Sequence, residues 1–343
     1  MGSVSRSSKK FAQMMLLKFL SWKTSPDSLT RYLLNVLGMD YEGEAEGDDA
    51  AFVARYPNGS QGCFCISVDS DNRDEDRREM STKATKELVS LCEEFAIPAT
   101  WAICGETAVN EDEAFRRIID SKVRHELAIH TFDHRDFSDP ACDEGLARSQ
   151  ITRTIELLPP SSKPATFVFP WNRCGHFDLL RDEGFIAYRG RARKLGYPSK
   201  TANLWDIHPL VYISERNYTY SNILKSLVDL AMARRALFHL WLHPWNLEVG
   251  GDVSKYLSET LRPLFQHARS KWREGKLWLC TLGELANYCE ARSNCTLTYT
   301  KPDNRSIIID AKCEIQDGRF IKEQYLTLGV RIPKNGIPEV SID

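Results

Sequence analysis

The stretch Cys63-Phe-Cys-Ile-Ser-Val-Asp-Ser-Asp71 decides the fold that this sequence predicts. Its first six residues form a short apolar run, which is typical of a strand buried on both faces. Residues 74–95 follow, and their apolar side chains recur at spacings of three and four, which predicts a helix. A buried strand followed directly by an amphipathic helix is a βα unit, and repeated βα units build parallel sheets.

The same alternation continues through the middle of the chain. Further strands are expected over residues 98–103, 126–130, 165–169, 185–188, 237–242 and 276–280. Helices are expected over residues 111–120, 143–158, 177–183, 222–236 and 254–274. This series of βα units favours a distorted (β/α)7-8 barrel. The alternative is a doubly wound open sheet, but no GxGxxG motif follows the first strand.

Composition divides the chain into three parts. Residues 1–55 are expected to form a helical and then loose extension, residues 56–290 the barrel, and residues 291–343 a small β-rich appendage. The appendage is expected because residues 306–310 and 325–330 are strand-like, with turn signals at residues 302–304 and 333–336. Within the extension, residues 9–22 contain a short apolar run interrupted by Gln13 and Lys18. The run is shorter than the ~20 residues of a membrane span and lacks a signal-peptide cleavage site.

Charge and cysteine content bound the partners and the compartment. The 343 residues carry a formal net charge of -2 with both signs mixed, so no nucleic-acid partner is expected. The basic runs at residues 189–194 and 234–235 are interpreted as solvated faces rather than phosphate sites. The ten cysteines include no CxxC pair and several fall in apolar runs, which indicates buried free thiols in a reducing compartment. We therefore expect a cytoplasmic protein, in which residues 9–22 pack on their own domain or make a peripheral membrane contact. Nothing in the sequence indicates an oligomeric state.

Polar side chains gather where the predicted strands end. Asp69 and Asp71 end the first strand, His130 ends the third, Arg189 follows the fifth and His243 follows the strand at 237–242. In a parallel barrel all of these ends lie on one face, which is the face that carries active sites. His130-Thr-Phe-Asp-His134 spaces two imidazoles four residues apart, as one helical turn would place them for a shared metal.

Asp71 would complete a set of two histidines and one carboxylate with open positions, which is typical of a catalytic metal. For the two aspartates the simpler alternative is capping of the following helix. For His134 it is a surface position in a polar loop. A non-haem iron oxygenase uses the same ligand set, but the βα alternation speaks against its usual β-sandwich.

At these positions the sequence resembles the NodB homology domain of the polysaccharide deacetylases, carbohydrate esterase family 4. The resemblance covers roughly residues 60–285. It rests on five motifs of this sequence, which are Ser67-Val-Asp-Ser-Asp71, His130-Thr-Phe-Asp-His134, Phe169-Pro-Trp-Asn-Arg173, Leu204-Trp-Asp206 and His239-Leu-Trp-Leu-His243. In the family's usual first motif the two aspartates are adjacent, whereas Ser70 separates them here. The family's third motif has an arginine two residues before the proline, and here that position is Val168.

The resemblance implies roles for individual residues. It makes Asp69 the general base, His243 the general acid, and Asp71, His130 and His134 the ligands of one divalent metal, most often zinc, with cobalt, nickel or manganese as alternatives. Arg173 is assigned to the catalytic set, and either Arg173 or Arg189 could orient Asp69. His239 is either a partner of the site or a core histidine. The expected substrate-binding residues are Pro170, Trp171, Asn172, Arg189, Trp205, Asp206 and Trp241, since aromatic rings suit the apolar faces of sugars, although each could instead pack in the core.

The function expected from this resemblance is removal of an N-acetyl group from an amino sugar. The substrate would be a polysaccharide, a lipid-linked sugar or an oligosaccharide. One alternative keeps the chemistry and changes the bond, as in a deformylase or a cyclic-amide hydrolase. Another is a sugar-binding protein with a catalytically degenerate site, since a fold does not fix a function.

Overall fold

The computed structural model describes residues 40–42, 51–72, 74–190, 194–213, 221–248, 252–300, 307–314 and 325–330. The expected helix at residues 9–22 and most of the expected extension at residues 1–55 lie outside the described residues. Within the described part of the chain, no helix is both long enough and apolar enough to cross a membrane.

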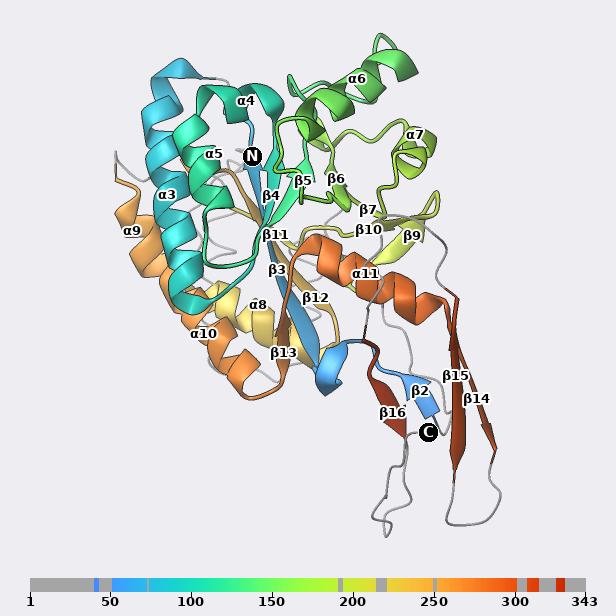
Figure 1. Cartoon of the computed structure of the whole chain (residues 1–343). Helices are drawn as coiled ribbons and strands as arrows, with labels where there is room; N and C mark the ends of the chain where they lie inside the picture. The colour runs from blue at the N-terminus through green and yellow to red at the C-terminus, as the bar shows by residue number, and fades with distance from the viewer. Residues whose placement is uncertain are drawn as a thin grey trace, which may run out of the picture.

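A curled sheet of parallel strands forms the centre of the molecule (Figure 1). Its core is β3 (Gly62–Ser70), the predicted first strand, which pairs with β12 on one side and β4 on the other. The strand order from there is β12-β3-β4-β5-β6-β7-β10. The bounds of the partner strands are β4 Thr100–Ile103, β5 Glu126–Ile129, β6 Thr166–Val168, β7 Ala187–Arg189, β10 Leu204–Asp206 and β12 Leu237–Leu242.

One continuous segment brings the two edges of this sheet together. β10 pairs with β7, and β11 (Val211–Tyr212), only a few residues later, pairs with β12. Between them, Ile207 N donates to Tyr188 O and Leu210 N donates to His239 O. The sheet therefore curls round on itself, which confirms the predicted distorted α/β barrel.

Helices cover the outside of the barrel and follow the predicted order. Their bounds are α3 Arg78–Phe95, α4 Gly105–Asn110, α5 Asp112–Ile119, α6 Glu144–Ile155, α7 Phe177–Asp182, α8 Ser221–Ala233, α9 Ser254–Tyr256 and α10 Arg262–Arg273, with one π-helical turn at Leu257–Leu261. Period-two alternation divides β3 between two environments. Phe64, Ile66 and Val68 face the helices in the main core, whereas the alternate residues face the barrel interior.

An unpredicted helix, α11 (Leu282–Ser293), covers the end of the barrel where the strands begin. Its first amides bind the first residues of two strands, since Leu282 N donates to Thr100 Oγ1 and Gly283 N donates to Glu126 Oε2. Its apolar face packs on the interior residues in a second core cluster. The capping box formed by Thr281 and Glu284 is the signal that could have predicted this helix.

Short strands complete the described structure. The described strands of the β-rich tail form two antiparallel pairs. β14 (Cys295–Thr300) pairs with β15 (Ile308–Cys313), and β16 (Leu328–Val330) pairs with β2 (Ala51–Val53). Thus a segment that precedes the barrel pairs with a segment that follows it. Elsewhere, β1 (Asp40–Glu42) lies beside β8 (Lys194–Gly196), β9 (Ser199–Thr201) lies beside β10, and β13 (Leu277–Leu279) lies beside β3.

Candidate active site

The barrel brings the predicted chemical residues to the end where its strands terminate. Asp69 lies at the end of β3, and Asp71 just beyond it, whereas His130 follows β5 and His243 follows β12. The four residues come from three strand ends, and the parallel strand order places these ends around one opening of the barrel. Asp69, Asp71 and His130 are buried, so their charges act where water screens them little.

Asp71, His130 and His134 converge on one point. Their candidate ligand atoms all lie within 4.8 Å of one another. His134 Nε2 is 2.9 Å from Asp71 Oδ2, and His130 Nε2 is 3.6 Å from the same oxygen. His130 Nδ1 donates to the backbone oxygen of Val168 at 2.7 Å, so the proton of the neutral ring sits on Nδ1. His130 Nε2 and Asp71 Oδ1 are buried without a hydrogen-bond partner, as expected of metal ligands. This donor set fits a divalent ion such as zinc.

A loop, and not the expected helical turn, brings the two histidines together. Thr131 and His134 have φ angles of 62° and 59°, in the left-handed region that an α-helix excludes. Gln150 of α6 holds the loop, because its Oε1 accepts from the backbone amides of Phe132 and Asp133 at 2.9 and 3.0 Å. The spacing of the two histidines was therefore a correct guide to their proximity but a wrong guide to the backbone that produces it.

Asp69 is held by a bidentate contact from Arg189. The two guanidinium nitrogens Nη1 and Nη2 donate to Asp69 Oδ1 and Oδ2 at 2.7 and 2.6 Å, and Trp241 Nε1 donates to Oδ2 at 2.9 Å. Arg189 is fully buried, and its guanidinium also lies over the Trp241 ring. The alternative of helix capping by the two aspartates does not hold, because Asp74 provides the cap by accepting from Asp76 N.

A polar chain beneath Asp69 fixes the position of Arg189. Arg189 Nη1 donates to Ser67 Oγ at 3.1 Å, and Ser67 Oγ lies 2.8 Å from His239 Nε2. His239 Nδ1 lies 3.1 Å from two backbone oxygens, those of Ile207 and His208, which can only accept. The proton of His239 is therefore on Nδ1, its Nε2 accepts from the Ser67 hydroxyl, and that hydroxyl accepts from Arg189. The donor and acceptor of each hydrogen bond in this series are thus fixed by the next one. His239 is therefore connected to the site through Ser67 and Arg189.

The electrostatics favour the charge states that the chemistry needs. Burial by itself would raise the pKa of Asp69, but Arg189 and His130 outweigh it and hold the pKa below its usual value. The pKa of Asp71 lies well below its usual value, because His243 and the two other histidines outweigh its burial. Burial, helped by Arg189, lowers the pKa of His239 to about 3, so this ring is neutral as its hydrogen bonds require.

His243, which follows β12, lies close to the carboxylates of both Asp69 and Asp71. Its Nε2 is 3.8 Å from Asp69 Oδ2 and 3.8 Å from Asp71 Oδ1. Asn246 Oδ1 lies 3.0 Å from His243 Nδ1 and accepts its proton in a hydrogen bond, which leaves Nε2 directed at the site. The ring also stacks on Trp245 with centroids 4.4 Å apart. Asn246 was not among the predicted residues, and its signal is a polar side chain three residues beyond a strand-end histidine.

Comparisons with known proteins agree with this geometry. Residues 55–170 match the polysaccharide deacetylase family. This segment includes Asp69 and the three candidate metal ligands Asp71, His130 and His134. A chitooligosaccharide deacetylase from Rhizobium leguminosarum bv. phaseoli is 31% identical over 78 residues, which are 23% of this chain and 33% of that protein. The match thus spans about a third of the length of this curated relative.

Solved structures share the fold. A protein described as a polysaccharide deacetylase from Mycobacterium smegmatis superposes with a TM-score of 0.56 at 16% identity, covering 76% of this chain and 100% of its own. A second such protein, from Pseudomonas aeruginosa PAO1, has a TM-score of 0.53 at 14% identity and covers 68% and 92%. An allantoinase has a TM-score of 0.53 at 14% identity and covers 68% and 91%.

The chain is thus similar to the polysaccharide deacetylases over residues 55–170. Two residues that were expected in the site, Arg173 and Trp205, make other contacts in the structure. Arg173 is largely exposed and pairs with Asp136 at 2.7 Å, so Arg189 and not Arg173 contacts Asp69. Trp205 lies in the second core cluster and its Nε1 donates to Glu290 at 2.7 Å, which removes it from the site. The basic run at residues 189–194 is not a uniformly solvated face, because Arg189 is in the interior and residues 191–193 lie outside the described part.

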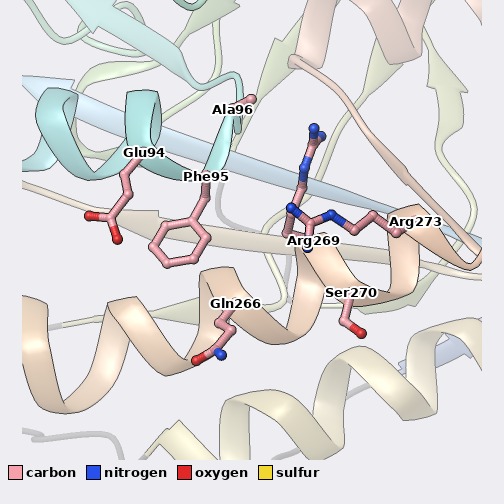
Figure 2. A pocket seen from close by; sticks show the side chains of 7 residues that line it. All are labelled: Glu94, Phe95, Ala96, Gln266, Arg269, Ser270 and Arg273. Carbon is pink, nitrogen blue, oxygen red and sulfur yellow. The ribbon is translucent and has the colours of Figure 1, made fainter.

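The other expected substrate-binding residues take varied positions. Trp171 is 60% exposed and its ring lies edge-on to His134 with centroids 4.8 Å apart. Pro170 is buried, and Asn172 is half-buried. Asp206 is half-buried at the end of β10. A separate surface pocket of about 370 Å³ lies between the end of α3 and α10, lined by Phe95 and residues of both helices (Figure 2). It is at the end of the barrel where strands begin and therefore contributes nothing to the Asp69 site.

Proposed function

We propose that this chain is a metal-dependent hydrolase that removes the N-acetyl group from an amino sugar. The observation that carries the proposal is the single cluster formed by Asp71, His130 and His134 beside the anchored carboxylate of Asp69, with His243 facing them. A metal-dependent hydrolytic site needs a metal set with open positions, a base and an acid, and this cluster has a candidate for each.

Asp71, His130 and His134 would hold the metal, which when bound supplies a Lewis acid for the acyl oxygen and a lowered pKa for a water molecule. Asp69 takes up the proton of the attacking water, and Arg189 and Trp241 keep its carboxylate charged and fixed in direction. Asn246 Oδ1 accepts the Nδ1 proton of His243, so the proton given to the leaving amine would be a second one, carried at Nε2. Protonation of the amine makes an amide cleavable near neutral pH.

An amino sugar is the substrate class that the family and the site surface favour together. The curated relative acts on chitooligosaccharides by name. Trp171 offers an exposed aromatic face next to His134, and such a face suits the apolar side of a pyranose ring. We propose an N-acetylated oligosaccharide or a larger glycan with the same unit.

The test is release of acetate from N-acetylated chitooligosaccharides by zinc-loaded protein. Asp69→Asn should abolish turnover while zinc stays bound, since Asp69 is not among the three ligands. Asp74→Asn is the matched control, because Asp74 is an exposed helix cap and asparagine caps equally well. Full turnover in Asp69→Asn would overturn the assignment of the base. Release of formate instead of acetate from a formylated analogue, with no acetate from the acetylated sugar, would replace the deacetylase by a deformylase.

A further inference from the structure

Three cysteines converge inside the barrel, away from the candidate active site. Cys63, Cys65 and Cys280 are each fully buried, and their sulfur atoms lie within 4.8 Å of one another. Cys65 Sγ and Cys280 Sγ are 3.5 Å apart. The convergence follows from strand pairing. Cys63 and Cys65 are alternate residues of β3 and face the same side. Cys280, just past β13 (Leu277–Leu279), is aligned with them because its backbone N–H donates a hydrogen bond to Phe64 O.

This cluster is separate from the Asp69 site. Along β3, Cys65 and Asp69 are four residues apart on the same face, which at the usual rise of a strand is about 13 Å. Ser67 and the layer of Arg189 and His239 lie between them. On the other side α11 closes the barrel, and its Leu282 and Cys289 belong to the same core cluster. The three sulfurs therefore lie buried in the barrel interior, apart from the Asp69 site.

We propose that Cys63, Cys65 and Cys280 bind a thiophilic metal ion in the barrel interior. A metal–sulfur bond of about 2.3 Å places the sulfurs of a three-coordinate ion about 4 Å apart, within the range observed here. The two strands thus present the thiols at ligand spacing without backbone movement. Thiolate ligands select copper(I) and zinc over harder ions, and binding would release the thiol protons.

Cadmium is the probe, because its bond to thiolate has an ultraviolet charge-transfer band that carboxylate and imidazole ligands do not produce. The reduced, metal-free, full-length protein is titrated with cadmium. The wild type should develop the band, and Cys65→Ala and Cys280→Ala should lose it. Cys92→Ala is the matched control, since Cys92 is equally buried in α3 outside the cluster. Asp71→Asn should also keep the band, which separates this site from the proposed hydrolytic one.

Two further measurements need no variant. X-ray absorption of cadmium-loaded wild type should show sulfur neighbours around a bound ion. Titration of the wild type with zinc and with copper(I) in separate arms identifies the ion held more tightly. A folded, reduced protein that gives neither the band nor sulfur neighbours would overturn the proposal. A band that persists in both Cys65→Ala and Cys280→Ala would overturn it as well.

Discussion

The buried pair of Arg189 and Asp69 gives the sharpest prediction. Arg189→Met keeps a long side chain in the barrel and removes the guanidinium. Asp69 would then keep Trp241 Nε1 as its remaining strong donor, while its carboxylate stays 2% exposed. A buried charge that loses its partner destabilises a protein by about 3–5 kcal/mol. We expect the free energy of unfolding to fall by about this amount.

Arg173→Met is the control, because it removes the guanidinium from the other arginine that was expected to orient Asp69. Arg173 has a side chain that is 65% exposed and pairs with Asp136 at the surface. Exposed ion pairs contribute about 0–1 kcal/mol, so the two variants should differ severalfold in their destabilisation. Urea unfolding followed by fluorescence measures both.

A double variant separates the charge from the packing. In Asp69→Asn/Arg189→Met a neutral amide replaces the carboxylate, so the penalty for an unpaired buried charge disappears. The double variant should therefore be more stable than Arg189→Met alone, and the two substitutions should be non-additive. Equal destabilisation by Arg189→Met and Arg173→Met, or strict additivity in the double variant, would refute the argument that Arg189 holds Asp69.

Three further predictions test other parts of the site and the fold. Asp71→Asn and His134→Ala should each weaken zinc binding by more than about 100-fold in a chelator competition, since even groups that only support ligands contribute 10–100-fold, and unchanged affinity would remove these residues from the metal set. Trp171→Ala should raise KM for an N-acetylated oligosaccharide roughly three- to tenfold with little change in kcat, from the usual strength of an aromatic contact, and an unchanged KM would exclude a sugar contact. Burial raises the pKa of Glu126 despite the hydrogen bonds from Thr100 and Gly283, so the folded protein holds this proton to higher pH than the unfolded chain and loses stability as the pH rises past the ordinary glutamate range. The free energy of unfolding of Glu126→Gln, measured relative to that of the wild type, should therefore increase from acid to neutral pH. A difference in unfolding free energy that stays constant across that range would contradict the raised pKa of Glu126.

The sequence was informative where its patterns are long. The apolar run before Asp69 is long enough to fix β3, and the alternation of strands and helices then fixes which end of the barrel carries the polar residues. That reasoning placed Asp69, Asp71, His130 and His243 at one opening, and the structure brings them together there. The period of two also placed His239 on the same strand face as His243, and the structure has it there beneath Asp69.

The rest could not be obtained because it depends on short or distant contacts. β7 and β10 have three residues each, too few to show by alternation that Arg189 faces inward toward Asp69 or that Trp205 packs with α11. Arg173 lies only three residues after Pro170, so proximity in sequence suggested a role that the loop geometry does not give it. Cys280 is separated from Cys65 by 215 residues, and their contact depends on the pairing of β13 with β3.

Metal binding by Asp71, His130 and His134 can be observed directly through the anomalous scattering of zinc in crystals of the zinc-loaded protein. We expect a peak about 2.0–2.2 Å from a carboxylate oxygen of Asp71 and from a ring nitrogen of each histidine. Crystals of fully loaded protein with no anomalous peak among these three side chains would contradict this expectation.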